Sequence, residues 1–255
     1  MKLLELAGVT KQFGGLTAVD DVGFSIEAGT ISAIIGPNGA GKTTLFNMIS
    51  GFLAPTRGTV SFDGQDVTGM RAVDIAARGL IRTFQLVQLF PDLTAFENVR
   101  IGAHLQSTGD IWAALWRGRR VREQTRMVDR MAMELLDFVG LEDRAGIGAT
   151  ELTYGQQRLL EIARALAARP RLLLLDEPAA GLNQEETGNL ALIVRQIVAQ
   201  GVTVLIIEHD MRLIMDIASK IIVLDFGKKL AEGGPEQVQN DPRVLEAYLG
   251  GVDYA

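Results

Sequence analysis

Residues 36–43 read GPNGAGKT, and this octapeptide constrains the fold more than any other part of the sequence. The apolar run ISAII at 31–35 predicts a strand before it, and a helical segment that can end at Gly51 follows it. The eight residues match G-x-x-x-x-G-K-[ST] in the strand, loop and helix setting that this pattern requires. We therefore predict a βα unit whose loop surrounds phosphate groups with backbone N–H donors.

Each residue type in this loop has a chemical task. The glycines let the backbone curl around phosphate oxygens, Lys42 supplies positive charge for the outer phosphates, and the Thr43 hydroxyl is a ligand for Mg²⁺. A glycine-rich turn that binds nothing is the alternative, and the flanking strand and helix disfavour it. The residues expected to contact a nucleotide here are Gly36, Pro37, Asn38, Gly39, Ala40, Gly41, Lys42, Thr43 and Thr44.

Further apolar runs predict the rest of the fold. The segments RLLLLDEP, GVTVLIIEHD and KIIVLDFG are nearly continuous apolar strands separated by helical stretches, which is typical of a parallel sheet covered by helices. The segment GTVSFDGQDVT alternates with period two about an Asp-Gly pair and predicts an antiparallel hairpin. We predict a single α/β domain over 1–255, with its core in 1–91 and 155–255 and a helical subdomain in 92–154.

An acid pair ends the strand LLLLDEP. Ligands of open α/β sheets bind at the carboxyl ends of the strands, so Asp176 and Glu177 are expected near the phosphate loop. Asp176 would hold Mg²⁺, directly or through water, and Glu177 would orient and polarise the attacking water. His209 follows the strand in VLIIEHD and is expected to reach the outermost phosphate from the same edge. An exposed acid pair and a structural histidine are the alternatives.

Two more residues are candidates on weaker patterns. Gln85 in RTFQLVQLF stands where the sheet meets the helical region, and its amide is suited to Mg²⁺ or the attacking water, although a surface glutamine needs no such role. Phe13 in TKQFGGL is suited to stacking on adenine, with core packing as the alternative.

Composition narrows the chemistry further. The chain has no cysteine and only two histidines, which excludes thiol catalysis and thiolate metal sites, so any metal should have oxygen ligands. The net charge of −6 gives no general nucleic-acid signature, and no nucleic acid is expected as a partner. The apolar runs are far shorter than the ~20 residues of a membrane-spanning helix, and the N-terminal segment MKLLELAGVTKQF is too short an apolar stretch for a signal peptide. We therefore expect a cytoplasmic location.

The segment ELTYGQQRLLEIARAL, residues 151–166, predicts an amphipathic helix with a cap. Thr153 precedes the helix and Gln156 stands three positions later, which is the spacing of a capping box. Such a cap needs no ligand, but a capped helix start also gathers N–H donors and positive potential, as an anion site requires.

With the loop, the acid pair, the histidine and LTYGQ in this order, the chain resembles the ATP-binding subunits of ABC transporters over nearly its whole length. The resemblance implies a P-loop NTPase fold, hydrolysis of ATP with Mg²⁺, and a head-to-tail dimer that encloses two ATP molecules. It places LTYGQ at the signature position, which closes over the ATP of the other subunit through Thr153, Gly155 and Gln156. The resemblance also implies that Phe13 stacks on adenine, that Gln85 is the glutamine of the glutamine loop, and that residues 179–183 form the loop that crosses the dimer.

Two positions depart from the wider family pattern. Tyr154 replaces a glycine and resists positive φ, and Asn183 stands where an aspartate is common. Both bear on how fast the site formed by this signature turns over ATP.

The segments RTFQLVQLF, LTAFENV, DEPAAGLNQEET and EAYLGG look like the larger-type ATPase of branched-chain amino-acid importers, in which a tyrosine in the signature is usual. This implies as partners a second ATPase subunit, two membrane permeases docked near 85–97 and, indirectly, an external substrate-binding protein, at the cytoplasmic face of the plasma membrane. A transporter of urea, amides or another small solute is the alternative, and a soluble ABC ATPase outside transport is a weaker one. The basic segment 117–126 is a solvated helix face or a contact with lipid or a partner.

Overall fold

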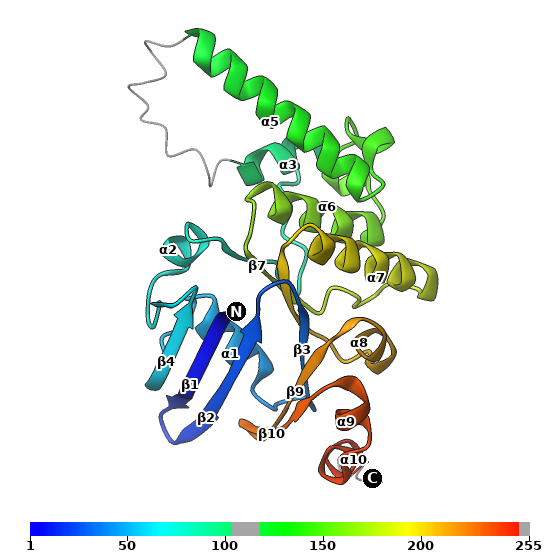
Figure 1. Ribbon diagram of the computed structural model, residues 1–255. Coiled ribbons are helices and arrows are strands. Elements are labelled where there is room, and N and C mark those ends of the chain that lie inside the picture. Colours follow the sequence, from blue (N-terminus) through cyan, green and yellow to red (C-terminus); the bar gives the residue numbers. More distant parts are fainter. Residues whose placement is uncertain (104–117, 250–255) are drawn as a thin grey trace. The chain divides into compact units, whose positions relative to one another are not determined.

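The computed structural model describes residues 1–103 and 118–249, which form two compact units (Figure 1). Unit 1 contains 1–82, 171–179 and the chain from 187 onward, and unit 2 contains 83–170 and 180–186. Unit 1 carries all strands of the two sheets, and unit 2 is helical in its described part.

The larger sheet of unit 1 positions the predicted site. Its strand order is β10-β9-β3-β8-β7-β6, and all neighbouring pairs are parallel except β9 with β10. The central strands β3, β7 and β8 are buried along their whole length, because helices cover both faces. The strands are β3 (Ile31–Ile35), β6 (Leu80–Arg82), β7 (Leu172–Asp176), β8 (Thr203–Ile207), β9 (Lys220–Asp225) and β10 (Lys228–Gly233).

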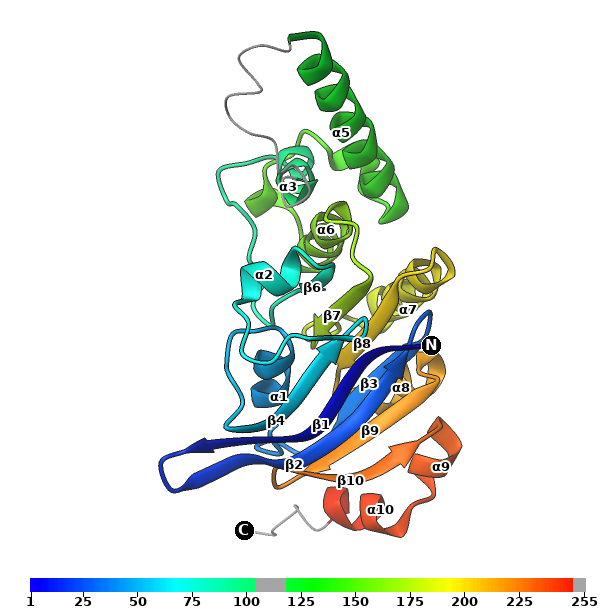
Figure 2. The ribbon, with the colours of Figure 1, turned by 60° about the vertical axis from the view of Figure 1, so that its left-hand side comes forward.

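The smaller sheet of unit 1 is antiparallel, with strand order β2-β1-β4-β5, and its strands β1, β2 and β4 are labelled in Figure 2. The predicted hairpin is confirmed in β4 and β5, which turn at Asp63-Gly64. One apolar core joins the two sheets through helix α1, whose Leu45, Phe46 and Ile49 are fully buried in it. The strands are β1 (Lys2–Phe13), β2 (Leu16–Glu27), β4 (Arg57–Phe62) and β5 (Gln65–Asp66).

The helices of unit 1 lie on both sides of the parallel strands, with α1 and α8 on opposite sides (Figure 1). Phe226 and Gly227 form the turn between β9 and β10, with φ of 43° and 80°. The helices are α1 (Lys42–Ile49), α2 (Ala72–Ala76), α7 (Gln184–Ala199, beginning in unit 2), α8 (Met211–Ile217), α9 (Pro235–Gln239) and α10 (Pro242–Leu249).

The described part of unit 2 contains helices α3, α5 and α6, which pack on one another (Figure 2). Gly102 of α3 lies against the backbone of Arg164 in α6, where a Cβ would overlap the Arg164 carbonyl oxygen, so a glycine is required there. The helices are α3 (Ala95–Gly102), α5 (Gly118–Phe138) and α6 (Tyr154–Ala167), with short 3₁₀ turns η2 (Glu142–Arg144) and η3 (Ala149–Glu151).

The boundaries of unit 2 differ from the helical subdomain expected at 92–154. Helix α6 packs on α3 and α5, and segment 83–91 is bonded to α6, so both belong to unit 2. The basic segment 117–126 lies in the first part of α5, except for Arg117, which is outside the described residues.

Candidate functional site

The loop 36–41 is shaped by glycines that no other residue replaces easily. Gly36 has φ 148°, and a Cβ there would overlap the carbonyl oxygen of Leu224. Gly41 has φ 96° and stands at the N-cap of α1, where no side chain accepts a hydrogen bond from the helix. The first N–H groups of α1 are therefore left for an anion, as the predicted phosphate site requires.

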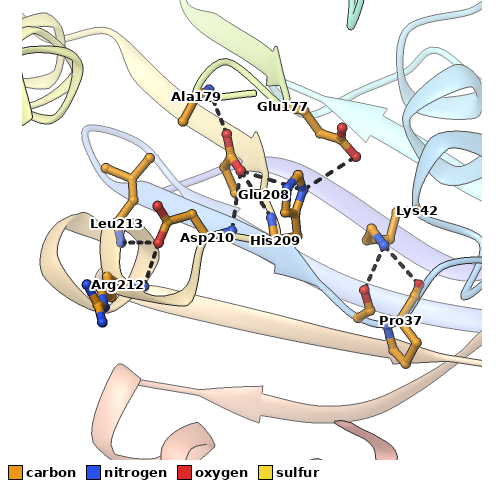
Figure 3. Close-up of polar contacts among 10 residues, drawn as sticks. Pro37, Lys42, Glu177, Ala179, Glu208, His209, Asp210, Arg212 and Leu213 are labelled. Atoms are coloured by element: carbon orange, nitrogen blue, oxygen red, sulfur yellow. Dashed lines mark hydrogen bonds and ion pairs between the residues drawn. The ribbon is translucent and has the colours of Figure 1, made fainter. Parts of the chain in front are cut away.

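Lys42 follows at the first position of α1. Its ammonium group donates to the carbonyl oxygens of Gly36 at 2.7 Å and Pro37 at 2.9 Å, which holds it along the loop (Figure 3). Burial lowers the pKa of Lys42, while the nearby carboxylates of Glu177 and Asp176 oppose this shift. The structure thus gathers the cation and the two acids at one place, as the motifs predict.

Asp176 ends β7 and is buried, with its residue surface only 3% exposed. The guanidinium of Arg82, at the end of the neighbouring strand β6, donates to Asp176 Oδ2 at 2.7 Å. Arg82 also donates to Asn47 and Ser50 of the loop-following helix α1 and its end. The sequence prediction missed Arg82, because no local pattern links it to Asp176, which is 94 positions away.

Glu177 has a strained backbone. Its φ is +46°, in the left-handed region that costs a residue with a Cβ roughly 1–2 kcal/mol, and its N–H donates to Ile207 at the end of β8 at 2.9 Å. Its Oε1 lies 3.9 Å from Nδ1 of His209, and the two side chains point toward each other (Figure 3). Strain of this kind is common at functional sites, so it supports a chemical role for Glu177.

Glu208 is a second residue that the sequence prediction missed. Its carboxylate is buried and accepts hydrogen bonds from the N–H groups of Ala179 at 2.7 Å and His209 at 3.1 Å, with Asp210 at 3.5 Å (Figure 3). Burial raises the pKa of Glu208, and these N–H donors oppose the shift. Glu208 therefore holds the backbone on both sides of the site, at His209 and at the start of loop 179–183.

Phe13 is the last residue of β1 and precedes the Gly14-Gly15 turn into β2. Its side chain is 47% exposed, which leaves the ring free of the core, and the Lys11 ammonium lies 5.2 Å from the ring centre. Core packing is therefore excluded for Phe13, and stacking on a base stays a prediction.

The predicted signature residues form the start of α6 in unit 2. Thr153 and Gln156 make the predicted capping box: the Thr153 hydroxyl accepts from the Gln156 N–H, and the Gln156 side chain accepts from the Thr153 N–H. Tyr154 is the first helical residue, and none of residues 153–156 has a positive φ. The expected conflict between tyrosine and backbone geometry is thus absent at this position, because the chain is already helical there.

Loop 180–186 packs beside the signature in unit 2. Asn183 and Glu186 exchange hydrogen bonds, each side chain accepting from the other's N–H. A Cβ on Gly155 would overlap the Glu186 carboxylate, and the Tyr154 ring edge lies against Gly181. Asn183 thus serves as a cap for α7, a role for which its amide oxygen suffices without charge.

Gln85 also belongs to unit 2, and its side chain is exposed. Unit 1 alone brings together Lys42, Asp176, Glu177 and His209. The exposed Thr43 hydroxyl and the Asp176 carboxylate are hard oxygen donors of the kind that Mg²⁺ takes together with nucleotide phosphates, so these residues fit the predicted metal.

Comparison with known proteins is consistent with this geometry. Residues 19–180 match the family described as ABC transporter, and residues 228–254 match branched-chain amino acid ATP-binding cassette transporter. The chain is 46% identical to the high-affinity branched-chain amino acid transport ATP-binding protein BraF of Pseudomonas aeruginosa, over 97% of this chain and 98% of that protein. It is 43% identical to LivG of Escherichia coli K12, with the same description and the same coverage.

Solved structures give the same fold. An ATP-binding cassette of an ABC transporter in its ADP conformation has a TM-score of 0.85 at 33% identity, covering 98% of this chain and 99% of that one. A dimeric cassette in a post-hydrolysis state, bound to ADP and Pi, has a TM-score of 0.78 at 27% identity, covering 91% and 99%. The predicted P-loop NTPase fold is thus confirmed. In the described part of the chain, no helix has the length and apolar character needed to cross a membrane.

Proposed function

The chain belongs to the ATP-binding family of ABC transporters, and on that premise we propose that it is the ATP-hydrolysing subunit of an importer for branched-chain amino acids. The cargo is inferred from BraF and LivG, whose names state branched-chain amino acid transport. The observation that carries the catalytic part is the gathering of Lys42, Asp176, Glu177 and His209 at the carboxyl ends of neighbouring strands.

The phosphates of ATP would be held by the N–H groups of loop 36–44 and by Lys42. In the structure, Lys42 already bonds two loop carbonyls, so its ammonium is oriented before a nucleotide arrives. Thr43 and Asp176 would hold Mg²⁺, which when bound neutralises phosphate charge. Arg82 fixes one oxygen of Asp176, and this leaves the other oxygen for the metal.

Glu177 would act as the general base that orients and polarises the attacking water. Its strained backbone is held by the bond from its N–H to Ile207, so its side chain starts from a fixed point. His209 faces Glu177 and would contact the outermost phosphate. Gln85 would assist at the metal or the attacking water.

Two further contacts to ATP would complete the site, one to its adenine base and one from a second ATPase subunit. Phe13, exposed at the end of β1, would stack on adenine. Thr153, Gly155 and Gln156 would receive the outer phosphate of the ATP held by a second subunit, which is consistent with the dimeric cassettes among similar structures. The position of these residues at the start of α6 supports this, because the dipole of the helix favours an anion at its N-terminus.

The permeases would dock on unit 2 at segment 85–97, which places the ATPase at the cytoplasmic face of the membrane. An open groove of about 600 Å³ in this unit supports the proposal, since its lining is mostly apolar and also includes charged side chains. The external substrate-binding protein would act only through the permeases. The groove residues are Thr94, Phe96, Glu97, Arg100, Asp129, Arg130, Met133, Ala145 and Gly146.

A transporter of urea, amides or another small solute is the alternative for the cargo, because no residue of this site touches the transported molecule. The match of residues 228–254 to the branched-chain amino acid family favours the first reading. Transport assays in membranes that contain the permeases, with leucine and urea as competing labelled solutes, separate the two.

Light scattering of the Glu177→Gln variant, with and without Mg-ATP, tests the proposed site. Blocked hydrolysis should trap ATP and give a dimer, whereas Lys42→Ala in the same background should stay monomeric because the phosphates lose their cation. A monomer with bound ATP would contradict closure within a homodimer and would require a second ATPase or the permeases.

The signature is tested in the same assay with Gly155→Asp. A side chain at Gly155 would meet Glu186 of the same chain, so the variant is made in a Glu186→Ser background and compared with Glu186→Ser alone. Loss of the dimer only in the double variant supports closure over phosphate. An unchanged dimer would leave the signature with the capping role alone.

A further inference from the structure

Helix α6 holds a buried ion pair that the proposed site does not use. Nη1 of Arg158 lies 3.5 Å from Oε2 of Glu161, one turn further on, and each side chain is 3% exposed. Burying two charges is unfavourable unless further hydrogen bonds satisfy them, and such a pair is weak support for stability by itself. The partners of the two side chains therefore indicate what the pair does.

Both side chains reach the same stretch of backbone, at Phe84 and Gln85. Glu161 Oε1 accepts from the Phe84 N–H at 3.3 Å, and Arg158 Nη1 donates to the Phe84 carbonyl at 2.9 Å. Nη2 of Arg158 donates to the Gln85 carbonyl. The Gln85 backbone is thus fixed on α6 by charged, buried groups, while its side chain stays exposed.

These bonds are strong for their kind. Hydrogen bonds to charged groups are stronger than those between neutral groups, and here water is excluded from both charged partners. Burial raises the pKa of Glu161, while the Phe84 N–H, Arg158, Arg164 and the Gln88 N–H favour its charged form. The segment that carries Gln85 is therefore held along several residues.

The other end of this network is the signature. The Arg158 guanidinium lies 5.4 Å from the ring centre of Tyr154, which is a cation–π arrangement. The edge of the same ring lies against Gly181 in loop 180–186. Tyr154 thus has a structural reason to replace glycine: its ring supports the arginine that holds Gln85.

We propose that Arg158, seated by Glu161, is a positioning residue that fixes Gln85 to the signature helix, so that Gln85 and the signature act as one rigid element during ATP hydrolysis. This rests on the proposed function, in which Gln85 acts on the metal or the attacking water. The 14-residue helix α6 is the rigid body that carries both. A displacement at its capped start would then move Gln85 with it.

The test is a double-variant cycle of Arg158→Lys and Gln85→Ala. Lysine keeps a positive charge beside Glu161 but lacks the planar fork that reaches two carbonyls. We expect Arg158→Lys to lower kcat about tenfold with the KM for ATP unchanged, which is within the usual range of coupling effects. Gln85→Ala should also be slow, and the double variant should be no slower than Gln85→Ala alone.

A second readout needs no nucleotide. Hydrogen exchange of the free protein should become faster at the Phe84 amide in Arg158→Lys, and stay unchanged at amides inside α6. If Arg158→Lys folds poorly, Glu161→Gln serves in its place, because its amide oxygen still accepts from Phe84 but the charge that seats Arg158 is gone. The matched control is Arg195→Lys, in an exposed pair with Asp216, which should alter neither kcat nor exchange.

The outcomes separate this inference from the proposed function. Multiplying effects in the double variant, or unchanged exchange at Phe84, would overturn the positioning role of Arg158. Normal hydrolysis by Gln85→Ala would instead overturn the proposed role of Gln85, and faster exchange at Phe84 would then still support the fixing of this segment by Arg158.

Discussion

The guanidinium of Arg82 donates to Oδ2 of Asp176 at 2.7 Å, and the two side chains are 5% and 4% exposed. The same guanidinium donates to Asn47 and Ser50, so one buried cation links the strand that ends in the acid pair to the helix that follows the phosphate loop. The position of the proposed metal ligand Asp176 is therefore set within unit 1.

Replacing Arg82 with alanine should lower the free energy of unfolding by about 3–5 kcal/mol, because Asp176 would be left as an uncompensated buried charge. Urea denaturation of the nucleotide-free protein measures this. Arg71→Ala is the control, since Arg71 pairs with Asp74 at the surface, where solvent screens the pair, and its loss should change stability far less. Equal effects of the two substitutions would contradict the importance of burial.

At position 177 we expect glycine to stabilise the fold more than alanine does, which is the reverse of the usual order. Because its φ is +46°, Glu177→Gly should be more stable than Glu177→Ala, by roughly 1 kcal/mol. At the exposed Gln196 in the last turn of α7, the alanine variant should be the more stable one by about the same amount. Thermal unfolding of the four variants measures these differences. If the alanine variant were the more stable one at both positions, the backbone at 177 would have left its positive φ.

Turnover at Glu177 is a separate matter. Glu177→Gln should keep ATP binding and lower the rate of hydrolysis by about 10²–10⁴-fold, because the amide cannot take a proton from the attacking water. Single-turnover hydrolysis of bound ATP measures the chemical step directly. Normal hydrolysis by this variant would remove Glu177 from the role of general base.

The site residues that could be predicted from the sequence lie in short motifs, and each motif is recognisable from the strand that precedes it. The phosphate loop, the acid pair and the histidine each follow a strand, and parallel strands bring their carboxyl ends together. Arg82 was missed because its partner Asp176 is 94 positions away, and no local pattern marks such a pair. Glu208 was missed for a related reason: an acid beside a histidine is recognisable, but its bond to Ala179 depends on the tertiary fold.

Local sequence patterns also could not predict which segments belong to the helical unit 2. Helix α6 is amphipathic, as predicted, but periodicity does not say which neighbours cover the apolar face. Here α3 and α5 do, and the charged side chains of Arg158 and Glu161 draw segment 84–85 to the same helix. The backbone at Tyr154 shows a similar limit: the expected conflict between tyrosine and a positive φ does not arise, because the chain is already helical there.

Lys42→Ala should abolish ATP binding. The ammonium is the cation of the phosphate loop, and it is partly buried, so solvent does not replace it. Isothermal titration with Mg-ATP is the measurement, and circular dichroism checks that the fold persists. Lys229→Ala is a control, because the ammonium of Lys229 bonds Glu232 and the Gly23 carbonyl; this variant should bind ATP normally.

Glu208 makes stability depend on pH. Burial raises its pKa in the folded protein above the ordinary value of 4.5, so its protonated form favours folding. This contribution is fully present below about pH 4.5 and is lost as the pH rises through the folded pKa. The stability of the native chain relative to Glu208→Gln should therefore fall as the pH rises over that window, as urea denaturation at several pH values would measure.

The comparison with Glu208→Gln isolates this group, because other carboxylates titrate alike in both proteins. Glutamine keeps an oxygen that accepts from the Ala179 N–H, but its NH₂ group then faces the N–H groups of His209 and Asp210. A constant difference in unfolding free energy between the two proteins is therefore expected at every pH. The titration of Glu208 is seen only in how the difference in unfolding free energy changes with pH. A relative stability that rises with pH would mean that the three N–H donors outweigh burial and hold the folded pKa of Glu208 below 4.5.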